Sequence, residues 1–249
     1  MKTVAVIPAR MGSGRLPGKV MANVAGRPLL DHLLARLALC PLIDDIVVAT
    51  STNRENNIID EYCQKKGVNV FRGSEDDVLD RLLGALSTYS ADVGVLAFGD
   101  GPLLDPKIIS KAIQMFYSNR DLDFVGNDLS TSWPPGMEIE VFSIDALADS
   151  HQRCKDIEIR EHGTLYMRQH PDIYRVHNLE APPELRRPDL SFEVDVPEDL
   201  NVIETILAHF NGQADVSLET IIYFMDNNPE LIAHTSHVTR RWRKFRGEN

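Results

Sequence analysis

Cysteine is scarce in this sequence. The 249 residues include only Cys40, Cys63 and Cys154, with no C-x-x-C pair among them. An odd, scattered set of this kind argues against a disulfide framework and against a cysteine-based zinc site. It is typical of a protein kept in a reducing compartment.

Long apolar runs are absent as well. No stretch approaches the roughly 18 residues needed to cross a bilayer, and the N-terminus turns polar after too few apolar residues to form a signal peptide. We therefore expect a cytoplasmic protein without membrane insertion.

Positive charge is in deficit. The chain has 26 Lys and Arg against 37 Asp and Glu, a formal net charge of −11. A field of this sign repels phosphate backbones, so we expect no nucleic-acid partner. Any phosphate group that the protein binds must meet a local basic site. The 43% hydrophobic and 25% charged residues otherwise suit an ordinary globular protein.

The first hundred residues alternate between two patterns. Short apolar runs predict strands, and segments with one apolar helical face predict helices. Strands that alternate with helices, joined by right-handed crossovers, give an α/β fold with a doubly wound parallel sheet. The expected strands are residues 4–7, 46–50, 68–71 and 93–98, and the expected helices start at Pro28 and cover 54–66 and 77–90.

The pattern loosens after residue 121. We expect strands at 122–126, 138–143 and 190–195, a loop at 130–136, a helix at 157–169 and another that begins at Pro197. No internal repeat and no Gly/Ser-rich linker interrupts the chain. The sequence therefore predicts a single domain over residues 1–249, with an inserted α+β subregion at about 125–190 and a helical tail at about 212–249.

The loop after the first strand carries the strongest functional signal. Residues 8–19 read PARMGSGRLPGK, in which glycines let backbone N–H groups approach an anion, while Arg10, Arg15 and Lys19 supply positive charge. Ser13 stands where a Walker A loop needs glycine, and Pro17 stands where a dinucleotide fingerprint needs Gly or Ala. The loop therefore favours a nucleotidyltransferase over a P-loop kinase or a dehydrogenase.

Two aspartates follow apolar runs that predict strands. Asp100 lies between two glycines, and Asp195 precedes the helix that begins at Pro197. Carboxylates at strand ends suit Mg²⁺, which takes oxygen ligands and shares its coordination shell with phosphate. Asp100 could instead close the strand with an Asx-turn, and the two readings stay open. Glu198 and Asp199 fit the dipole of a first helical turn.

Several segments together resemble one enzyme family. The loop 8–19, the segments 99–106 (GDGPLLDP) and 194–200 (VDVPEDL), and SEDDVLDR at 74–81 are similar to the cytidylyltransferases that make CMP-activated sugars. This family includes the CMP-sialate and CMP-3-deoxy-octulosonate synthetases. Further similarity at Pro135 and Gly136, at 140–143, at 160–162 and in the tail points to the spore-coat polysaccharide protein F type.

The resemblance implies a Rossmann-like sheet and a role for each matching residue. Arg10 and Lys19 would be catalytic, and Asp100 and Asp195 would bind Mg²⁺. The expected nucleotide-binding residues are Pro8, Ala9, Arg10, Gly12, Ser13, Arg15, Lys19, Ser74, Asp77, Arg81 and Asp100; the expected acceptor-binding residues are Glu140, Arg160, Glu161 and His162. Arg160, Glu161 and His162 could instead form an interface or capping cluster on a helix, and both readings stay open. Gly101 and Gly163 depart from residues common in this type, both near the expected acceptor pocket.

The implied reaction transfers CMP from CTP to a small acceptor and releases pyrophosphate. The acceptor would be a sugar acid, a sugar phosphate or a phosphonate, in surface polysaccharide biosynthesis. The resemblance also implies a homodimer in which region 125–190 completes the partner's acceptor pocket. That region lacks an obvious helix layer of its own, which is the physical motive for pairing.

Two other functions compete with this one. A glycosyltransferase that uses a nucleotide sugar usually carries an Asp-x-Asp metal pair, which the sequence after Asp100 lacks. A catalytically silent ligand-binding protein of the same pathway would not need both carboxylates and the loop lysine. The basic segment 239–246 suggests either a poorly ordered terminus or a contact with a membrane surface or an acidic partner.

Overall fold

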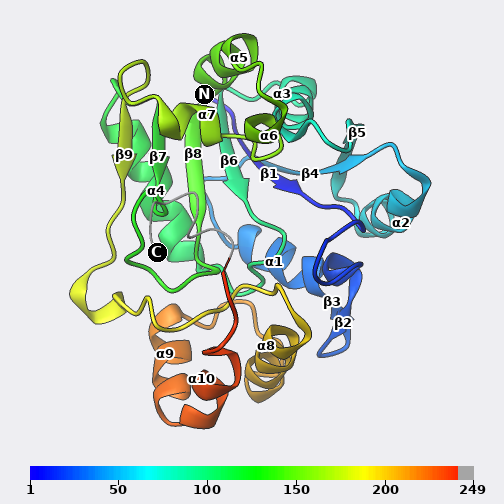
Figure 1. Ribbon diagram of the computed structural model, residues 1–249, viewed down its shortest axis with the longest axis vertical. Helices are drawn as coiled ribbons and strands as arrows, with labels where there is room; N and C mark the ends of the chain where they lie inside the picture. Colours follow the sequence, from blue (N-terminus) through cyan, green and yellow to red (C-terminus); the bar gives the residue numbers. More distant parts are fainter. Residues whose placement is uncertain (241–249) are drawn as a thin grey trace.

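The computed structural model describes residues 1–240 and is built around one seven-stranded sheet (Figure 1). The strand order is β5-β4-β1-β6-β8-β7-β9, and only β8 runs antiparallel to its neighbours. The strands are β1 (Thr3–Pro8), β4 (Asp45–Ser51), β5 (Asn69–Gly73), β6 (Val93–Ala97), β7 (Phe124–Gly126), β8 (Ile139–Ser143) and β9 (Val176–Asn178). The expected α/β, mostly parallel, doubly wound sheet is confirmed.

Ten α-helices accompany the sheet in the described residues. They are α1 (Leu29–Leu37), α2 (Asn57–Lys66), α3 (Val78–Thr88), α4 (Pro106–Ser118), α5 (Ile144–Arg153), α6 (Ile157–Arg160), α7 (Leu165–Gln169), α8 (Pro197–His209), α9 (Leu218–Asp226) and α10 (Pro229–Thr235). Short 3-10 turns are η1 (Lys19–Met21), η2 (Arg54–Asn56) and η3 (Pro183–Leu185), and a small hairpin joins β2 (Asn23–Val24) to β3 (Arg27–Pro28).

Both faces of the sheet are buried, as the continuous apolar runs of its parallel strands require. On β1, Ala5 and Ile7 pack in the core that α1, α4, α8 and α9 complete. Val4 and Val6 point into a second core with α3, α5 and α7. The sheet is therefore the middle layer between two sets of helices. No helix of the described residues is long and apolar enough to span a membrane.

The strand order places the functional loops. The chain moves outward from β1 through β4 to β5 and then returns to place β6 on the other side of β1. The order therefore reverses between β1 and β6. Open α/β sheets bind ligands at such a switch point, beyond the carboxyl ends of the strands. The loops after Pro8 and Ala97 emerge there.

Two expected elements differ from the structure. The helix expected at 157–169 is two short helices, α6 and α7. Between them Gly163 has a φ of +60°, and a Cβ there would lie 2.8 Å from Leu82 Cδ1. The left-handed conformation interrupts the helix and lets the chain pass close to α3.

The prediction of a strand at 190–195 is wrong. Its alternating burial, with Leu190, Phe192 and Val194 inside, has the period of a strand. Its backbone, however, pairs with loops and not with the sheet: Phe192 N donates to Pro135 O at 2.6 Å, and Val194 N donates to Asp100 O at 2.9 Å. This extended segment still carries Asp195 to the edge where β6 ends.

Residues 125–190 contribute to the central sheet and to its layers. Strands β8 and β9 lie in this region and extend the sheet beyond β6. Helix α5, which the sequence pattern did not reveal, packs with Leu147 against the core beside α3. The region thus has a helix layer of its own, contrary to our expectation.

Helices α8, α9 and α10 gather at one end of the molecule (Figure 1). After α10 the last described residues, in red, run back toward the middle of the molecule. Of the basic segment 239–246, residues 239 and 240 are described and 241–246 lie outside the described residues.

Candidate active site

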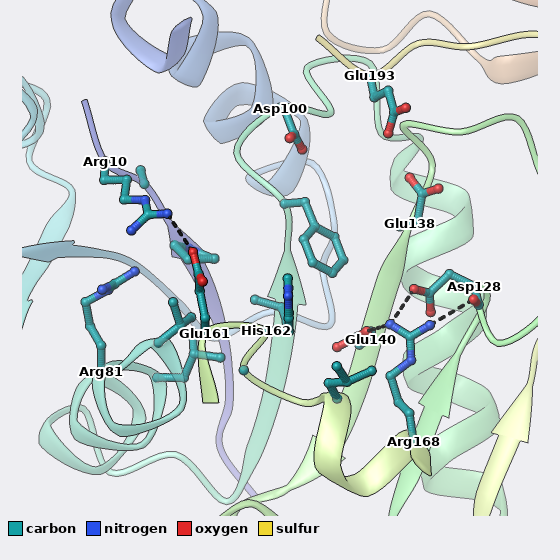
Figure 2. Close-up of a pocket in the computed structure, with 18 of the residues that line it drawn as sticks. Arg10, Arg81, Asp100, Asp128, Glu138, Glu140, Glu161, His162, Arg168 and Glu193 are labelled. Carbon is teal, nitrogen blue, oxygen red and sulfur yellow. Dashed lines mark hydrogen bonds and ion pairs between the residues drawn. The ribbon is translucent and has the colours of Figure 1, made fainter. Parts of the chain in front are cut away.

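A cavity of about 370 Å³ opens where β1 and β6 end. Figure 2 shows two unlike sides of it: Arg10 and Arg81 on one, and the carboxylates of Asp128, Glu138 and Glu193 on the other. Of the expected site residues, the cavity is lined by Pro8, Ala9, Arg10, Arg15, Arg81, Asp100, Glu140, Glu161, His162 and Asp195. Segments far apart in the sequence thus meet at one site.

Lys19 joins the two predicted metal carboxylates. Gly18 in a left-handed conformation (φ +74°) turns the loop into η1, which Lys19 begins. From there Lys19 Nζ lies 2.8 Å from Asp100 Oδ2 and 3.1 Å from Asp195 Oδ1, and it donates to Val194 O at 2.7 Å. Burial alone would lower the pKa of Lys19, but the two carboxylates outweigh it and raise that pKa above 10.5.

Arg15 also contacts this cluster. Its Nη2 lies 2.5 Å from Asp195 Oδ2, and its Nη1 donates to Thr239 O at 3.0 Å. Two cations of the loop therefore face one carboxylate. Their positive charge offsets the cost of burying the Asp195 carboxylate, of which only 14% is exposed.

Arg10 lies between two carboxylates. Its Nη1 lies 3.3 Å from Glu75 Oε1. Its Nη2 lies 3.1 Å from Glu161 Oε1 (Figure 2). Asn56 fixes the loop behind it, because its Oδ1 accepts from Met11 N at 2.7 Å. The amide nitrogen of Asn56, Nδ2, donates to Ser51 Oγ and to Glu75 Oε2.

Sequence reasoning missed both Glu75 and Asn56. Glu75 lies inside the 74–81 motif and could have been found there. Asn56 carries no sequence signal, since it belongs to a 3-10 turn on a distant segment. Gly12 and Ser13 lie outside the lining of the cavity: Ser13 N donates to Met11 O at 2.9 Å within the loop itself.

The 74–81 motif builds a turn at the start of α3. Asp77 caps the helix by accepting from Asp80 N at 2.9 Å, and Ser74 Oγ accepts from Asp77 N at 3.1 Å. The buried Arg81 donates through Nη1 to the carbonyls of Ser74 and Glu75. Of the three predicted residues, only Arg81 lines the cavity.

Arg160 does not line the cavity, and its predicted acceptor contact stays a prediction. Its Nε lies 2.8 Å from Asp77 Oδ2, and its Nη1 donates to the carbonyls of His151 and Cys154 at 3.0 and 2.9 Å. A guanidinium so engaged holds α6 against the start of α3. The neighbouring Glu161 and His162 do reach the cavity (Figure 2).

The acidic side of the cavity is the part that the sequence reveals least. Glu140 is fully buried, and its Oε1 lies 3.1 Å from Nη1 of Arg168, which also lies 2.9 Å from Asp128 Oδ2. Burial, together with the neighbouring charges of Glu138 and Asp195, raises the pKa of Glu193 to about 8. Asp128, Glu138, Arg168 and Glu193 were not predicted, although Glu138 lies between the matching segments 135–136 and 140–143 and Glu193 lies two residues before Asp195.

Asp100 and Asp195 fit a divalent cation. Their oxygens already face one positive group, the ammonium of Lys19, and carboxylate oxygens are the donors that Mg²⁺ prefers. The described part of the chain has no group of three or more His, Cys, Asp or Glu side chains placed to hold a metal. Two carboxylates suit an ion that completes its shell with water and substrate phosphate.

Comparisons with known proteins agree with this arrangement. The sequence pattern of the family described as cytidylyltransferase matches residues 4–224. The chain is 35% identical, over 231 residues, to spore coat polysaccharide biosynthesis protein SpsF of Bacillus subtilis, covering 90% of this chain and 94% of that protein. It is 37% identical over 123 residues to the 3-deoxy-manno-octulosonate cytidylyltransferase of Trichlorobacter lovleyi, about half of each chain.

The structure is similar to that of a cytidylyltransferase from Leptospira borgpetersenii. The two share a TM-score of 0.88 and 30% sequence identity over 96% of this chain and 99% of the other. The family match covers most of the chain and includes the glycine-rich loop and both aspartates that meet at Lys19. The chain belongs to the cytidylyltransferase family and is a CTP-dependent nucleotidyltransferase.

Proposed function

We propose that this enzyme transfers CMP from CTP to a sugar acid or a related small molecule, with release of pyrophosphate, in surface polysaccharide biosynthesis. The observation that carries the proposal is the meeting of Lys19, Asp100 and Asp195 beside the basic loop. The names of the Bacillus and Trichlorobacter relatives support a sugar acid and a polysaccharide pathway.

The proposed chemistry depends on alignment and on charge neutralisation. An acceptor oxygen attacks the α-phosphorus of CTP, and the bond to the pyrophosphate oxygen breaks. Lys19 and Arg10 neutralise negative charge on the α-phosphate and on the departing pyrophosphate. Asp100 and Asp195 hold Mg²⁺, which when bound supplies Lewis-acid stabilisation of the phosphate oxygens. The described cavity needs no protein nucleophile for this reaction.

The acidic side of the cavity indicates which chemical groups the acceptor would carry. Carboxyl groups form hydrogen bonds with hydroxyls in either protonation state, so Glu138 and Glu193 suit the hydroxyl groups of a polyhydroxylated acceptor. Arg168 is the guanidinium on this side and suits an acidic group of the acceptor, although Asp128 and Glu140 already neutralise it. His162 lines the cavity and is the proposed acceptor of the proton from an attacking hydroxyl.

Family membership favours this function over both competing ones. A cytidylyltransferase uses the nucleoside triphosphate itself, whereas a glycosyltransferase uses a nucleotide sugar. The intact contact between Lys19, Asp100 and Asp195 also disfavours a catalytically silent protein.

Nucleotide choice gives the first test. In calorimetry with Mg²⁺ present, CTP should bind at least about tenfold more tightly than ATP, GTP or UTP, a difference of about 1.4 kcal/mol. Pyrophosphate release with CTP should then require an acceptor from a panel of sugar acids, sugar phosphates and phosphonates. Equal affinity for all four nucleotides would overturn the proposed function.

The homodimer implied by the family resemblance gives a second test. Region 125–190 exposes apolar side chains, with Ile157 74% and Ile173 39% exposed, and such surface is what association would cover. Light scattering should give twice the 28.0 kDa chain mass at micromolar concentration. Ile157→Glu should lower that mass, and Tyr223→Glu, on an equally exposed residue outside the region, should not. A mass of one chain for the parent would contradict the dimer.

A further inference from the structure

Arg240 lies in an unusual place for a residue of a basic tail. Its side chain is 6% exposed and forms two hydrogen bonds to one carboxylate: Nη1 to Asp199 Oδ2 at 2.9 Å and Nη2 to Asp199 Oδ1 at 2.7 Å. Asp199 is itself 2% exposed. A buried bidentate pair of this kind is geometrically specific and is costly to break from one side.

Asp199 connects Arg240 to the backbone of the segment that bears Asp195. Its Oδ2 accepts from the backbone N–H groups of Asp195 at 2.8 Å and Val196 at 3.1 Å. The segment before α8 has no partner strand to hold it, so these bonds fix the backbone that bears the Asp195 carboxylate. An Arg240 guanidinium nitrogen, Nη1, also lies 3.4 Å from Glu193 Oε1. Arg240 thus contacts Glu193, before Asp195 in the sequence, and Asp199, after it.

The same tail segment reaches the basic loop. Thr239 O accepts from Arg15 Nη1 at 3.0 Å, and Arg15 Nη2 contacts Asp195. Residues 239 and 240 therefore touch the loop on one side and the Asp195 segment on the other. The sequence analysis offered two interpretations of the basic tail, a poorly ordered terminus and a contact with a membrane surface or an acidic partner. Neither predicted this contact of residues 239 and 240 with the site.

We propose that residues 239–240 form a clasp between the basic loop and the Asp195 segment, in which Arg240 is a positioning residue that acts through Asp199 to hold Asp195 toward Lys19 and Mg²⁺. The proposal rests on the proposed function, because the position of Asp195 matters through the phosphates and the metal ion that it serves. Within the described residues, Arg240 itself forms no hydrogen bond or ion pair with Lys19 or Asp100.

The test is the Mg²⁺ concentration needed for half-maximal CTP binding, measured by calorimetry on the full chain. Arg240→Lys keeps a positive charge but loses the two-pronged geometry. It should raise this concentration about 10-fold, and Arg240→Gln about 10- to 100-fold, as is usual when the partner that orients a metal ligand is lost. CTP binding without Mg²⁺ should change less than twofold in Arg240→Lys.

A matched control separates positioning from plain stability. Arg36 is also buried, at 2% exposure, and its Nη1 donates to Val216 O at 3.0 Å, in a part of the fold that does not line the cavity. Arg36→Lys should lower the Tm and leave the Mg²⁺ requirement unchanged. In an Asp195→Asn background, Arg240→Lys should add no further change, because the two substitutions act on one group.

The outcomes are distinct. If Arg240→Lys lowers the Tm as Arg36→Lys does and leaves the Mg²⁺ requirement at the parental value, the clasp is wrong and the proposed function stands. Additive effects of Arg240→Lys and Asp195→Asn would also overturn it. A parent that binds no CTP with Mg²⁺ overturns the proposed function and the clasp with it. Should Arg240→Gln fail to fold, Arg240→Lys alone decides.

Discussion

Lys19→Ala is expected to lower kcat by about 10²- to 10³-fold, the usual cost of losing one charge-stabilising donor at a reacting centre. The ammonium lies 2.8 and 3.1 Å from the carboxylates at which the phosphates and Mg²⁺ would gather. Its interaction strengthens as charge moves from the α-phosphate to the pyrophosphate, so its loss affects turnover more than ground-state affinity. The KM for CTP should rise far less than kcat falls.

Steady-state kinetics with saturating acceptor measure this effect. Lys19→Met keeps the apolar length of the side chain and should match the alanine variant, which shows that the charge is what matters. Lys65→Ala, at an exposed position on α2, should retain parental kinetics. If kcat stayed within about threefold of the parent while only the KM for CTP changed, Lys19 would be a binding residue without the proposed catalytic role.

Asp195→Asn should reduce turnover by at least about 10²-fold, since the amide keeps the shape of the side chain but removes the charge that would hold Mg²⁺ at the proposed site. The variant should also need more Mg²⁺ for CTP binding, a measurement independent of turnover. Asp100→Asn should act in the same direction. EDTA should abolish the activity of the parent.

The control for this charge removal is Asp226→Asn. Asp226 forms an exposed pair with Arg187 at 2.6 Å, and exposed ion pairs contribute little to stability. The fold of Asp195→Asn should be checked by circular dichroism, because Asp195 also neutralises Arg15. Undiminished activity in a folded Asp195→Asn protein would remove this residue from the proposed metal site.

The sequence predicts best those site residues that lie in loops directly after a strand. The loop after β1 and the loop after β6 must emerge at one edge of a parallel sheet, so Lys19 and Asp100 could be placed together in advance. Asp195 was expected at the same edge for a reason that proved wrong, because its segment is not a strand. Its alternating burial, together with hydrogen bonds from Phe192 N and Val194 N to loop carbonyls, carries the carboxylate there.

Residues from irregular segments were beyond such reasoning. Asp128 follows β7, Arg168 lies in the short helix α7, and Asn56 lies in η2, so no common periodicity links them. Arg160 shows the limit of reading a role from a motif. The sequence leaves both an acceptor contact and a capping cluster open for this residue, and the structure pairs it with Asp77 at the start of α3.

The hydrogen bond between Arg15 and Thr239 joins residues 224 positions apart. During synthesis the loop with Lys19 leaves the ribosome long before the segments that neutralise and position it. Strands β1 to β6 can form their sheet while the site is still incomplete, because contacts of long sequence separation form late. We therefore expect a chain interrupted near residue 230 to keep most of its core and the contacts of Lys19 with Asp100 and Asp195, and to lose the pairing of Arg240 with Asp199 that is proposed to position Asp195.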